Sequence, residues 1–204
     1  MTLPTTGSED PVSLTFPRLE RAHLARLRDW LNTPHVYEWW GVDAAADGLG
    51  GPGDKAATLE AVEAGYLPEL ERGGPTGYHL IVLHGTPIGM IQWYPLAAYP
   101  GYAAEIGEPA ADAAGIDLFI GDPTQVGRGL GPVVLRTFVE SIVFAHAEIT
   151  RCVGAPDVRN RRSIRAFEKA GFRWVRDADV TGEPAPEHVM VLDRDEAVRP
   201  TIQP

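Results

Sequence analysis

The stretch TQVGRGLGPVVLRTF, Thr124–Phe138, places three glycines at alternate positions and continues as an apolar segment with helical spacing. A dinucleotide fingerprint needs the spacing G-x-G-x-x-G, but Pro132 stands where its third glycine belongs, and the Gly-Lys-Ser/Thr ending of a P-loop is missing. What remains is a glycine-rich turn opening a helix near Leu130, where free N–H groups and the helix dipole attract an anion. The stretch therefore predicts a phosphate-binding turn. The alternative is a tight turn in which glycine only supplies positive φ.

The segments around this turn alternate between strand and helix patterns. Strands are predicted at 12–19, in a hairpin over 78–96 with its turn at 84–86, and at 115–123, 149–156, 172–175 and 187–192. Helices are predicted at 20–32, at 59–70 with a break near Pro68, from 130 to about 146, and at 160–170 with Gly171 closing the last. This order predicts an α/β (α+β) domain with one central sheet.

The chain has 204 residues, of which 44% are hydrophobic and 23% charged, a composition typical of one globular domain. We expect that domain at 13–194, a disordered N-terminal tail at 1–12 and a C-terminal tail at 195–204. The glycine-rich segment 41–54 is expected to be a flexible loop or lid. No apolar run approaches the roughly 20 residues of a membrane span, and the first residues do not resemble a signal peptide, so we expect a cytoplasmic protein without membrane contact.

Eighteen Lys and Arg against 28 Asp and Glu give a formal net charge of −10, which disfavours nucleic acid and favours a cationic small-molecule partner. Positive charge nevertheless gathers in 159–169, so the sequence indicates two ligands of opposite sign. A single cysteine, Cys152, rules out an internal disulfide and a multi-cysteine zinc site, and we predict no metal site. Monomer and homodimer are both left open.

One predicted strand after the glycine turn comes NRRSIRAFEKAGFRWV, residues 160–175. The two segments together resemble the GNAT superfamily of acyl-CoA N-acyltransferases, whose members have a Q/R-x-x-G-x-G/A turn and then an Asn-led helix ending in Y-E-K-x-G-F. Gly129 and Gly131 match the two glycines, whereas Val126 takes the Gln/Arg position and Phe167 takes the tyrosine position. The resemblance implies a single GNAT-like domain, with a central mixed twisted sheet whose splayed parallel strands are flanked by helices.

Further segments narrow the resemblance. DWLNTPHVYEWWG, GYLPEL, TPIGMIQWY, GIDLFIGDP and GRGLG occur in the same order as in aminoglycoside 6'-N-acetyltransferases, which are antibiotic-resistance enzymes, and in their siderophore-acylating relatives. The likeness covers roughly Leu14 to Leu192. One departure concerns the acidic residue that the resistance enzymes carry after their fifth strand: it aligns with Ala155, and Asp157 is displaced from it by two positions.

The resemblance implies acetyl-CoA as co-substrate. Its pyrophosphate would lie on the glycine turn, and its amide arm would pair with main-chain groups near Phe119 and Ile120, where an N–H group would also polarise the thioester carbonyl. Arg128, Arg162 and Lys169 are candidate phosphate donors, or simply exposed basic side chains. The residues predicted to contact acetyl-CoA are Phe119, Ile120, Gln125, Val126, Gly127, Arg128, Gly129, Leu130, Gly131, Asn160, Phe167 and Lys169.

The acceptor amine needs a base, because an amine with a pKa near 10.4 is neutral in only roughly one molecule in 2,500 at pH 7. Asp117 is the candidate for catalysis and amine binding, since strand alternation places it opposite Ile116 and Leu118; a buried hydrogen-bonding role is the alternative. The residues predicted to bind the acceptor are Trp39, Trp40, Tyr66, Tyr94, Tyr102, Asp117 and Glu183. Further candidates are Tyr99 as a wall and Glu38, Glu105, Asp177 and Asp179 as cation partners.

Three functions remain open. The leading hypothesis is acetyl transfer from acetyl-CoA to the 6'-amine of an aminoglycoside by direct attack on the thioester. The second is acylation of a siderophore-type lysine or hydroxylysine, which would depend less on Asp117 because a hydroxylamine is far less basic. The third is a non-catalytic protein that binds CoA or an antibiotic, because Phe167 lacks the hydroxyl that often protonates the departing thiolate.

Overall fold

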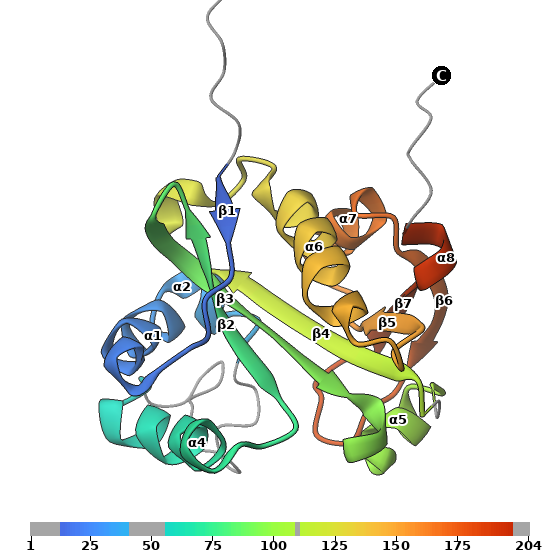
Figure 1. Cartoon of the computed structure of the whole chain (residues 1–204), viewed down its shortest axis with the longest axis horizontal. Coiled ribbons are helices and arrows are strands. Elements are labelled where there is room, and N and C mark those ends of the chain that lie inside the picture. Colours follow the sequence, from blue (N-terminus) through green and yellow to red (C-terminus); the bar gives the residue numbers. More distant parts are fainter. Residues whose placement is uncertain (1–12, 41–55, 109–110, 198–204) are drawn as a thin grey trace, which may run out of the picture.

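The computed structural model describes residues 13–40, 56–108 and 111–197. Within them, one seven-stranded sheet has the strand order β1-β2-β3-β4-β5-β7-β6 (Figure 1). Its strands are β1 (Leu14–Thr15), β2 (Gly77–Leu83), β3 (Thr86–Pro95), β4 (Ala113–Ile120), β5 (Arg151–Gly154), β6 (Arg173–Ala178) and β7 (Glu187–Asp193). Neighbouring strands pair antiparallel except β4 and β5, which are parallel. The predicted mixed central sheet is confirmed, although the strand predicted at 12–19 shrinks to two residues.

Helices cover both faces of the sheet. They are α1 (Leu24–Leu31), α2 (Pro34–Tyr37), α4 (Leu59–Arg72), α5 (Pro100–Glu105), α6 (Leu130–Ser141), α7 (Arg161–Lys169) and α8 (Arg194–Ala197). Four single turns of 3₁₀ helix are present in the described residues: η1 (Arg21–His23), η2 (Leu96–Ala98), η3 (Pro123–Gln125) and η4 (Val143–Ala145). The four predicted helices correspond to α1, α4, α6 and α7, because apolar spacing and capping residues determine where a helix forms and where it ends. The helix predicted to reach about residue 146 ends at Ser141, and the short helices α2, α5 and α8 were not predicted.

Strand alternation divides the core between the two faces. Ile116, on one face of β4, belongs to a cluster with α6 and α7. On the opposite face, Phe119 belongs to a cluster with α1 and α4, whereas Ala113 belongs to a separate cluster with α5, β5 and β7. Asp117 points to that opposite face, between Phe119 and Ala113. The sheet therefore holds this carboxylate where two apolar clusters end.

Helix α4 corrects one sequence prediction, since it continues through Pro68 without a break. Thr58 caps its start by accepting a hydrogen bond from the Ala61 N–H at 3.1 Å, and Gly73 ends it with a φ of 75°. Proline removes one helix hydrogen bond, but burial of Val62 and Tyr66 holds the helix against the core. Tertiary packing thus overrides the local preference that predicted a break.

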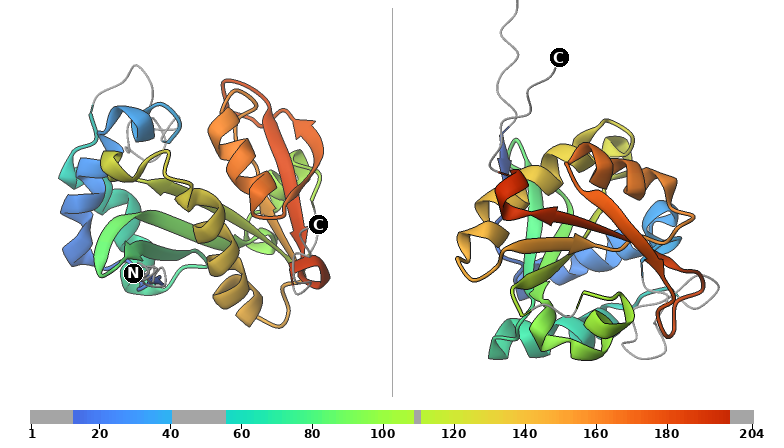
Figure 2. Two further views of the ribbon diagram at one scale, coloured as in Figure 1. Left: turned by 90° about the horizontal axis from the view of Figure 1, so that it is seen from above. Right: turned by 90° about the vertical axis from the view of Figure 1, so that its right-hand side faces the viewer.

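Strands β4 and β5 separate soon after they meet. They pair at Ala113–Arg151, Ala114–Cys152 and Gly115–Val153, and β4 then continues alone to Ile120. Beyond Gly154 the chain stays with β7 instead, because Pro156 O accepts from the His188 N–H at 2.7 Å. The two groups of strands accordingly diverge in the left view of Figure 2. This separation leaves one edge of β4 unpaired from Ile116 onwards.

The chain ends need a second correction. The predicted C-terminal tail, 195–204, begins inside α8, where Ala197 is buried and its carbonyl accepts a hydrogen bond from Arg136. The predicted N-terminal tail, 1–12, and the glycine-rich loop or lid, 41–54, lie outside the described residues. Among the helices that the structure describes, none combines the length and hydropathy needed to cross a membrane.

Gly154 provides a test of the β5–α7 packing. A Cβ atom there would overlap the ring of Phe167, so Gly154→Ala should destabilise the protein by about 2 kcal/mol through overpacking. The melting temperature should then fall by about 6 °C in calorimetry. Gly101→Ala in α5 is the matched control, because its Cβ atom would meet nothing within 4 Å. Equal melting temperatures for the two variants would contradict this packing.

Candidate functional site

A cavity of about 690 Å³ opens where β4 leaves β5. It draws residues from distant parts of the chain, which only the fold brings together. Its lining residues are Glu38, Trp39, Trp40, Gly65, Tyr66, Glu69, Tyr78, Gln92, Tyr94, Tyr99, Tyr102, Ile116, Asp117, Leu118, Ala155, Pro156, Asp157, Arg159, Asn160, Ser163, Phe167, Glu183, Pro184 and Glu187. Every residue predicted to bind the acceptor lies in this lining. The volume is within the range of small-molecule sites.

Asp117 lies in the wall that β4 contributes. Its Oδ2 accepts a hydrogen bond from Gln92 Nε2 at 3.0 Å, across the β3–β4 pair that places the two side chains on the same face. The Tyr94 hydroxyl also hydrogen-bonds to this carboxylate. Burial raises the pKa of Asp117 above its ordinary value, and the two hydrogen bonds oppose the rise. A raised pKa makes the carboxylate a better proton acceptor while it still faces the cavity.

Glu187 supplies a second half-buried carboxylate, which the sequence analysis missed. Tyr102, on α5, donates its hydroxyl to Glu187 Oε2 at 2.9 Å. Burial raises the pKa of Glu187 to about 8; the Tyr102 hydrogen bond opposes this rise, and the charges of nearby carboxylates add to it. Glu187 is the first residue of β7, which pairs antiparallel with β5, so it lies beside the end of β5. No local sequence pattern predicts that Glu187 lies beside β5, because this position depends on the order of the strands in the sheet.

Aromatic rings form much of the cavity wall. Trp40 packs edge-to-face on Phe119 with centroids 4.8 Å apart, and Tyr66 packs in the same way on Tyr78 at 5.1 Å. Tyr94 makes an edge contact with Tyr99 at 5.2 Å. These contacts hold the rings by packing, so a ligand meets a preformed surface.

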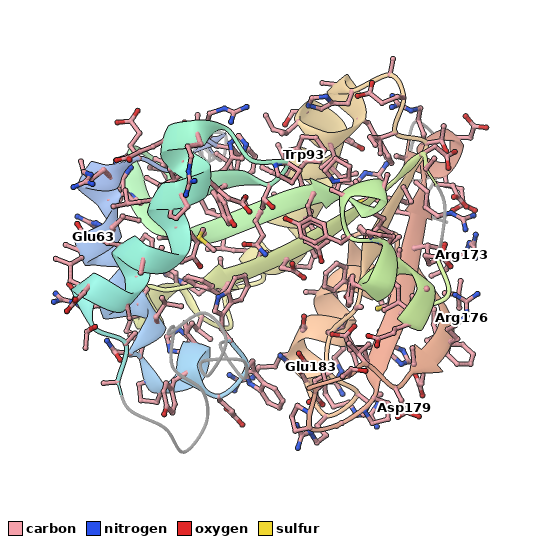
Figure 3. All side chains as sticks on the ribbon, turned by 90° about the horizontal axis from the view of Figure 1, so that it is seen from below. Glu63, Trp93, Arg173, Arg176, Asp179 and Glu183 are labelled. Atoms are coloured by element: carbon pink, nitrogen blue, oxygen red, sulfur yellow. The ribbon has the colours of Figure 1, made fainter. Side chains whose placement is uncertain are left out.

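The acidic candidates divide into two groups. Glu38 and Glu183 line the cavity. Figure 3 shows Glu183 near the opening between the two groups of strands and Asp179 farther out on the same β6–β7 hairpin. Glu105 accepts from the Thr181 hydroxyl at 2.7 Å, and Asp177 accepts from Trp174 Nε1 at 3.1 Å, both outside the lining. The interpretation of Glu105, Asp177 and Asp179 as cation partners is therefore wrong for this cavity.

Asp157 does line the cavity, although its charge is already paired. Its Oδ1 accepts from the Arg159 backbone N–H at 2.7 Å and from Arg159 Nε at 2.9 Å. These hydrogen bonds hold the pKa of Asp157 below its ordinary value.

The glycine turn joins η3, after β4, to the start of α6. Gly127 and Gly129 have φ values of 78° and 76°, which favour glycine, whereas a Cβ atom on Gly131 would come within 3.1 Å of the Ala166 Cβ of α7. The N–H groups of Leu130 and Gly131 open a helix, so they have no partner within it. Pro132 lacks an N–H group, so the turn itself must supply most donors. Positive φ thus requires glycine at the first two positions and close packing against α7 requires it at the third, whereas phosphate binding by the turn stays a prediction.

The other residues predicted to contact acetyl-CoA lie in three different places. Gln125 ends η3 and Val126 follows it, and Arg128 and Lys169 are exposed. Asn160 caps α7, its Oδ1 accepting from the Ser163 N–H at 3.1 Å. Phe167 is buried, packs edge-to-face on Phe172 and lines the cavity.

The register of β4 corrects the main-chain assignment. Gly121 N–H donates to Ile88 O at 2.8 Å, so alternate residues back along β4, including Phe119, direct their main-chain groups at β3. Leu118 and Ile120 direct theirs at the open edge, where Ile120 O hydrogen-bonds to His35 Nε2 at 2.8 Å. The main-chain groups of Phe119 therefore face β3, and Leu118 rather than Phe119 stands beside Ile120 at the open edge.

A mixed sheet with two separating parallel strands, a glycine turn opening α6 and an Asn-capped α7 define an acetyltransferase of the GNAT class. The family model for the acetyltransferase (GNAT) domain matches residues 20–180, and the chain belongs to this family. The resemblance found in the sequence is thereby confirmed.

The chain is also similar to individual acyltransferases of this family. The chain is 36% identical over 191 residues to aminoglycoside N(6')-acetyltransferase type 1 of Klebsiella pneumoniae, covering 93% of this chain and 86% of the relative. It is 28% identical to the lysine N-acyltransferase MbtK of Mycobacterium tuberculosis, over 87% of this chain and 76% of that one. The crystal structure of aminoglycoside acetyltransferase AAC(6')-Ib with coenzyme A superposes with a TM-score of 0.76, at 30% identity and 90% and 96% coverage.

Substitution of Gly129 tests the turn. Gly129→Val forces a β-branched residue into positive φ, which should displace the N–H groups and raise the KM for acetyl-CoA about tenfold or more. Steady-state thiol release measures this constant. Gly85→Val, in the β2–β3 turn at a φ of 79°, imposes the same strain elsewhere and should leave KM unchanged. An unchanged KM in Gly129→Val would place the phosphate site elsewhere.

Proposed function

We propose that this chain is an aminoglycoside 6'-N-acetyltransferase that moves the acetyl group of acetyl-CoA to a primary amine by direct attack on the thioester. One observation carries the proposal: Asp117 faces an acidic, aromatic cavity at the point where β4 loses its β5 partner. The donor and the acceptor then meet at this carboxylate.

The donor side fits the chemistry of acetyl-CoA. Its extended amide arm can pair like an added strand with the open edge of β4, through main-chain groups of Leu118 and Ile120. The pyrophosphate can accept from N–H groups of the turn at Gly129 and Leu130, where positive helix-dipole charge also lies. Acetyl-CoA supplies an activated acyl group. The relatives crystallised with coenzyme A or acetyl-CoA support this assignment.

The acceptor side fits an ammonium group that must lose a proton. Asp117 attracts the ammonium form and takes its proton, directly or through a water, and the neutral nitrogen then attacks the thioester carbon. The C–N bond forms, the C–S bond breaks and the electron pair leaves with sulfur. A thiolate of pKa about 8.5 is a fair leaving group, so Phe167 at the family's tyrosine position does not prevent turnover.

The charge of the cavity favours a polycationic acceptor. Among the described residues of its lining, six acidic side chains face one basic side chain. These are Glu38, Glu69, Asp117, Asp157, Glu183 and Glu187 against Arg159. A lysine side chain would neutralise only one of the carboxylates, which favours an amino sugar over the siderophore-type acceptor. Relatives crystallised with kanamycin and ribostamycin support the same class.

A base beside the open strand edge favours catalysis over passive binding of CoA or antibiotic. We place the protein in the cytoplasm, where acetyl-CoA is available, as a monomer or homodimer.

Asp117→Asn tests the base. It should lower kcat/KM for kanamycin by about 100-fold or more, because the amide takes no proton. The wild type should lose activity as pH falls through the raised pKa of Asp117, since protonation removes the base, and the variant should lack that limb. Thiol release across pH measures both.

Asp179→Asn is the matched control, since this exposed carboxylate lies outside the lining and should leave the rate unchanged. Retention of activity within threefold in Asp117→Asn would count against the base and favour the hydroxylamine-type acceptor.

A further inference from the structure

We propose that Glu187 binds a second ammonium group of the acceptor, beside the amine that Asp117 receives, and thereby selects polycationic acceptors over monoamines. This inference rests on the proposed function. It assigns a specificity role to a residue that no sequence motif indicates.

The fold directs Glu187 into the cavity. It begins β7 and forms an isolated antiparallel bridge with Asp157, just beyond the end of β5. The Tyr102 hydroxyl, donated to Oε2 at 2.9 Å, fixes the carboxylate while leaving lone pairs on both oxygens for further donors. Glu187 is thus held by its neighbours and faces the acceptor space.

Two tyrosines connect Glu187 to the base. Tyr94 hydrogen-bonds to Asp117, and Tyr102 hydrogen-bonds to Glu187. The two rings are neighbours, with centroids 6.4 Å apart. The carboxylates are near enough for the charge of Asp117 to raise the pKa of Glu187. One acceptor molecule can therefore place two amines on this pair.

The neighbouring residues on this wall are less suited to the role. Ala155 ends in a methyl group, and Asp157 is held by Arg159 through its backbone N–H and its guanidinium group. An ammonium group arriving at Asp157 would compete with that ion pair. At Glu187 it meets a carboxylate held by a neutral phenol, so binding breaks no ion pair.

Proton release follows from the environment of Glu187. The titratable and charged groups facing it are Tyr94 on β3, Tyr102 on α5, Asp117 on β4, Asp157 with its partner Arg159 after β5, and Glu183 before β7. With a pKa of about 8, Glu187 is mainly protonated at pH 7. An ammonium group favours the ionised form, so binding near pH 7 should release close to one proton from this residue. The release should vanish well above pH 8, where the residue is already ionised.

The test compares Glu187→Gln with the wild type on two acceptors, kanamycin and 6-amino-6-deoxyglucose, which carries a single amine. The ratio of kcat/KM for kanamycin to that for the monoamine should fall about tenfold or more in the variant. Glu105→Gln, a carboxylate outside the lining, is the matched control and should keep the wild-type ratio. A general structural defect would lower both acceptors equally and leave the ratio unchanged.

Calorimetry supplies the second readout. Kanamycin binding to the enzyme with coenzyme A is measured at pH 7 in two buffers of different ionisation enthalpy. Glu187→Gln should release about one proton fewer than the wild type. An unchanged ratio together with unchanged proton release overturns the inference and leaves the proposed function standing. Absence of kanamycin acetylation by the wild type overturns the proposed function and the inference with it.

Discussion

The site depends on the early separation of β4 from β5. After three paired positions the two parallel strands separate, because the chain beyond Gly154 follows β7 through Pro156 rather than β4. The main-chain groups of Leu118 and the N–H group of Ile120 are left at an open strand edge, and the space beside them becomes the cavity. In the proposed function both substrates use this opening: acetyl-CoA to extend the sheet, and the acceptor amine to reach the thioester.

Burial destabilises the ionised carboxylates of the cavity, and a cationic ligand offsets this destabilisation. Burial raises the pKa of Glu187 to about 8, and the charges of neighbouring carboxylates, Asp117 among them, add to the rise. Phenol and amide donors from Tyr102 and Gln92 stabilise individual oxygens without neutralising their charge. The cavity is therefore poorly stabilised in its ionised form and well suited to bind ammonium groups. Half-buried ionisable groups of this kind are typical of functional sites, where the needs of function oppose stability.

The sequence predicts features that depend on interactions between residues close together in the chain, and misses those that depend on distant residues. Turn glycines such as Gly129 and caps such as Asn160 are determined within a few residues, and strand alternation was enough to orient Asp117. The sequence could not assign Leu118 rather than Phe119 to the open edge, because that depends on the hydrogen-bond register with β3. Glu187 was missed for a similar reason: it reaches the site only because β7 lies next to β5 in the sheet.

A crystal structure of the complex with coenzyme A and kanamycin tests the central claim most directly. The account predicts that the arm of coenzyme A pairs with main-chain groups of Leu118 and Ile120 and that the 6'-amine lies within hydrogen-bond distance of the Asp117 carboxylate, directly or through one water. An amine held by another carboxylate, with Asp117 out of reach of both the amine and the sulfur, would contradict it.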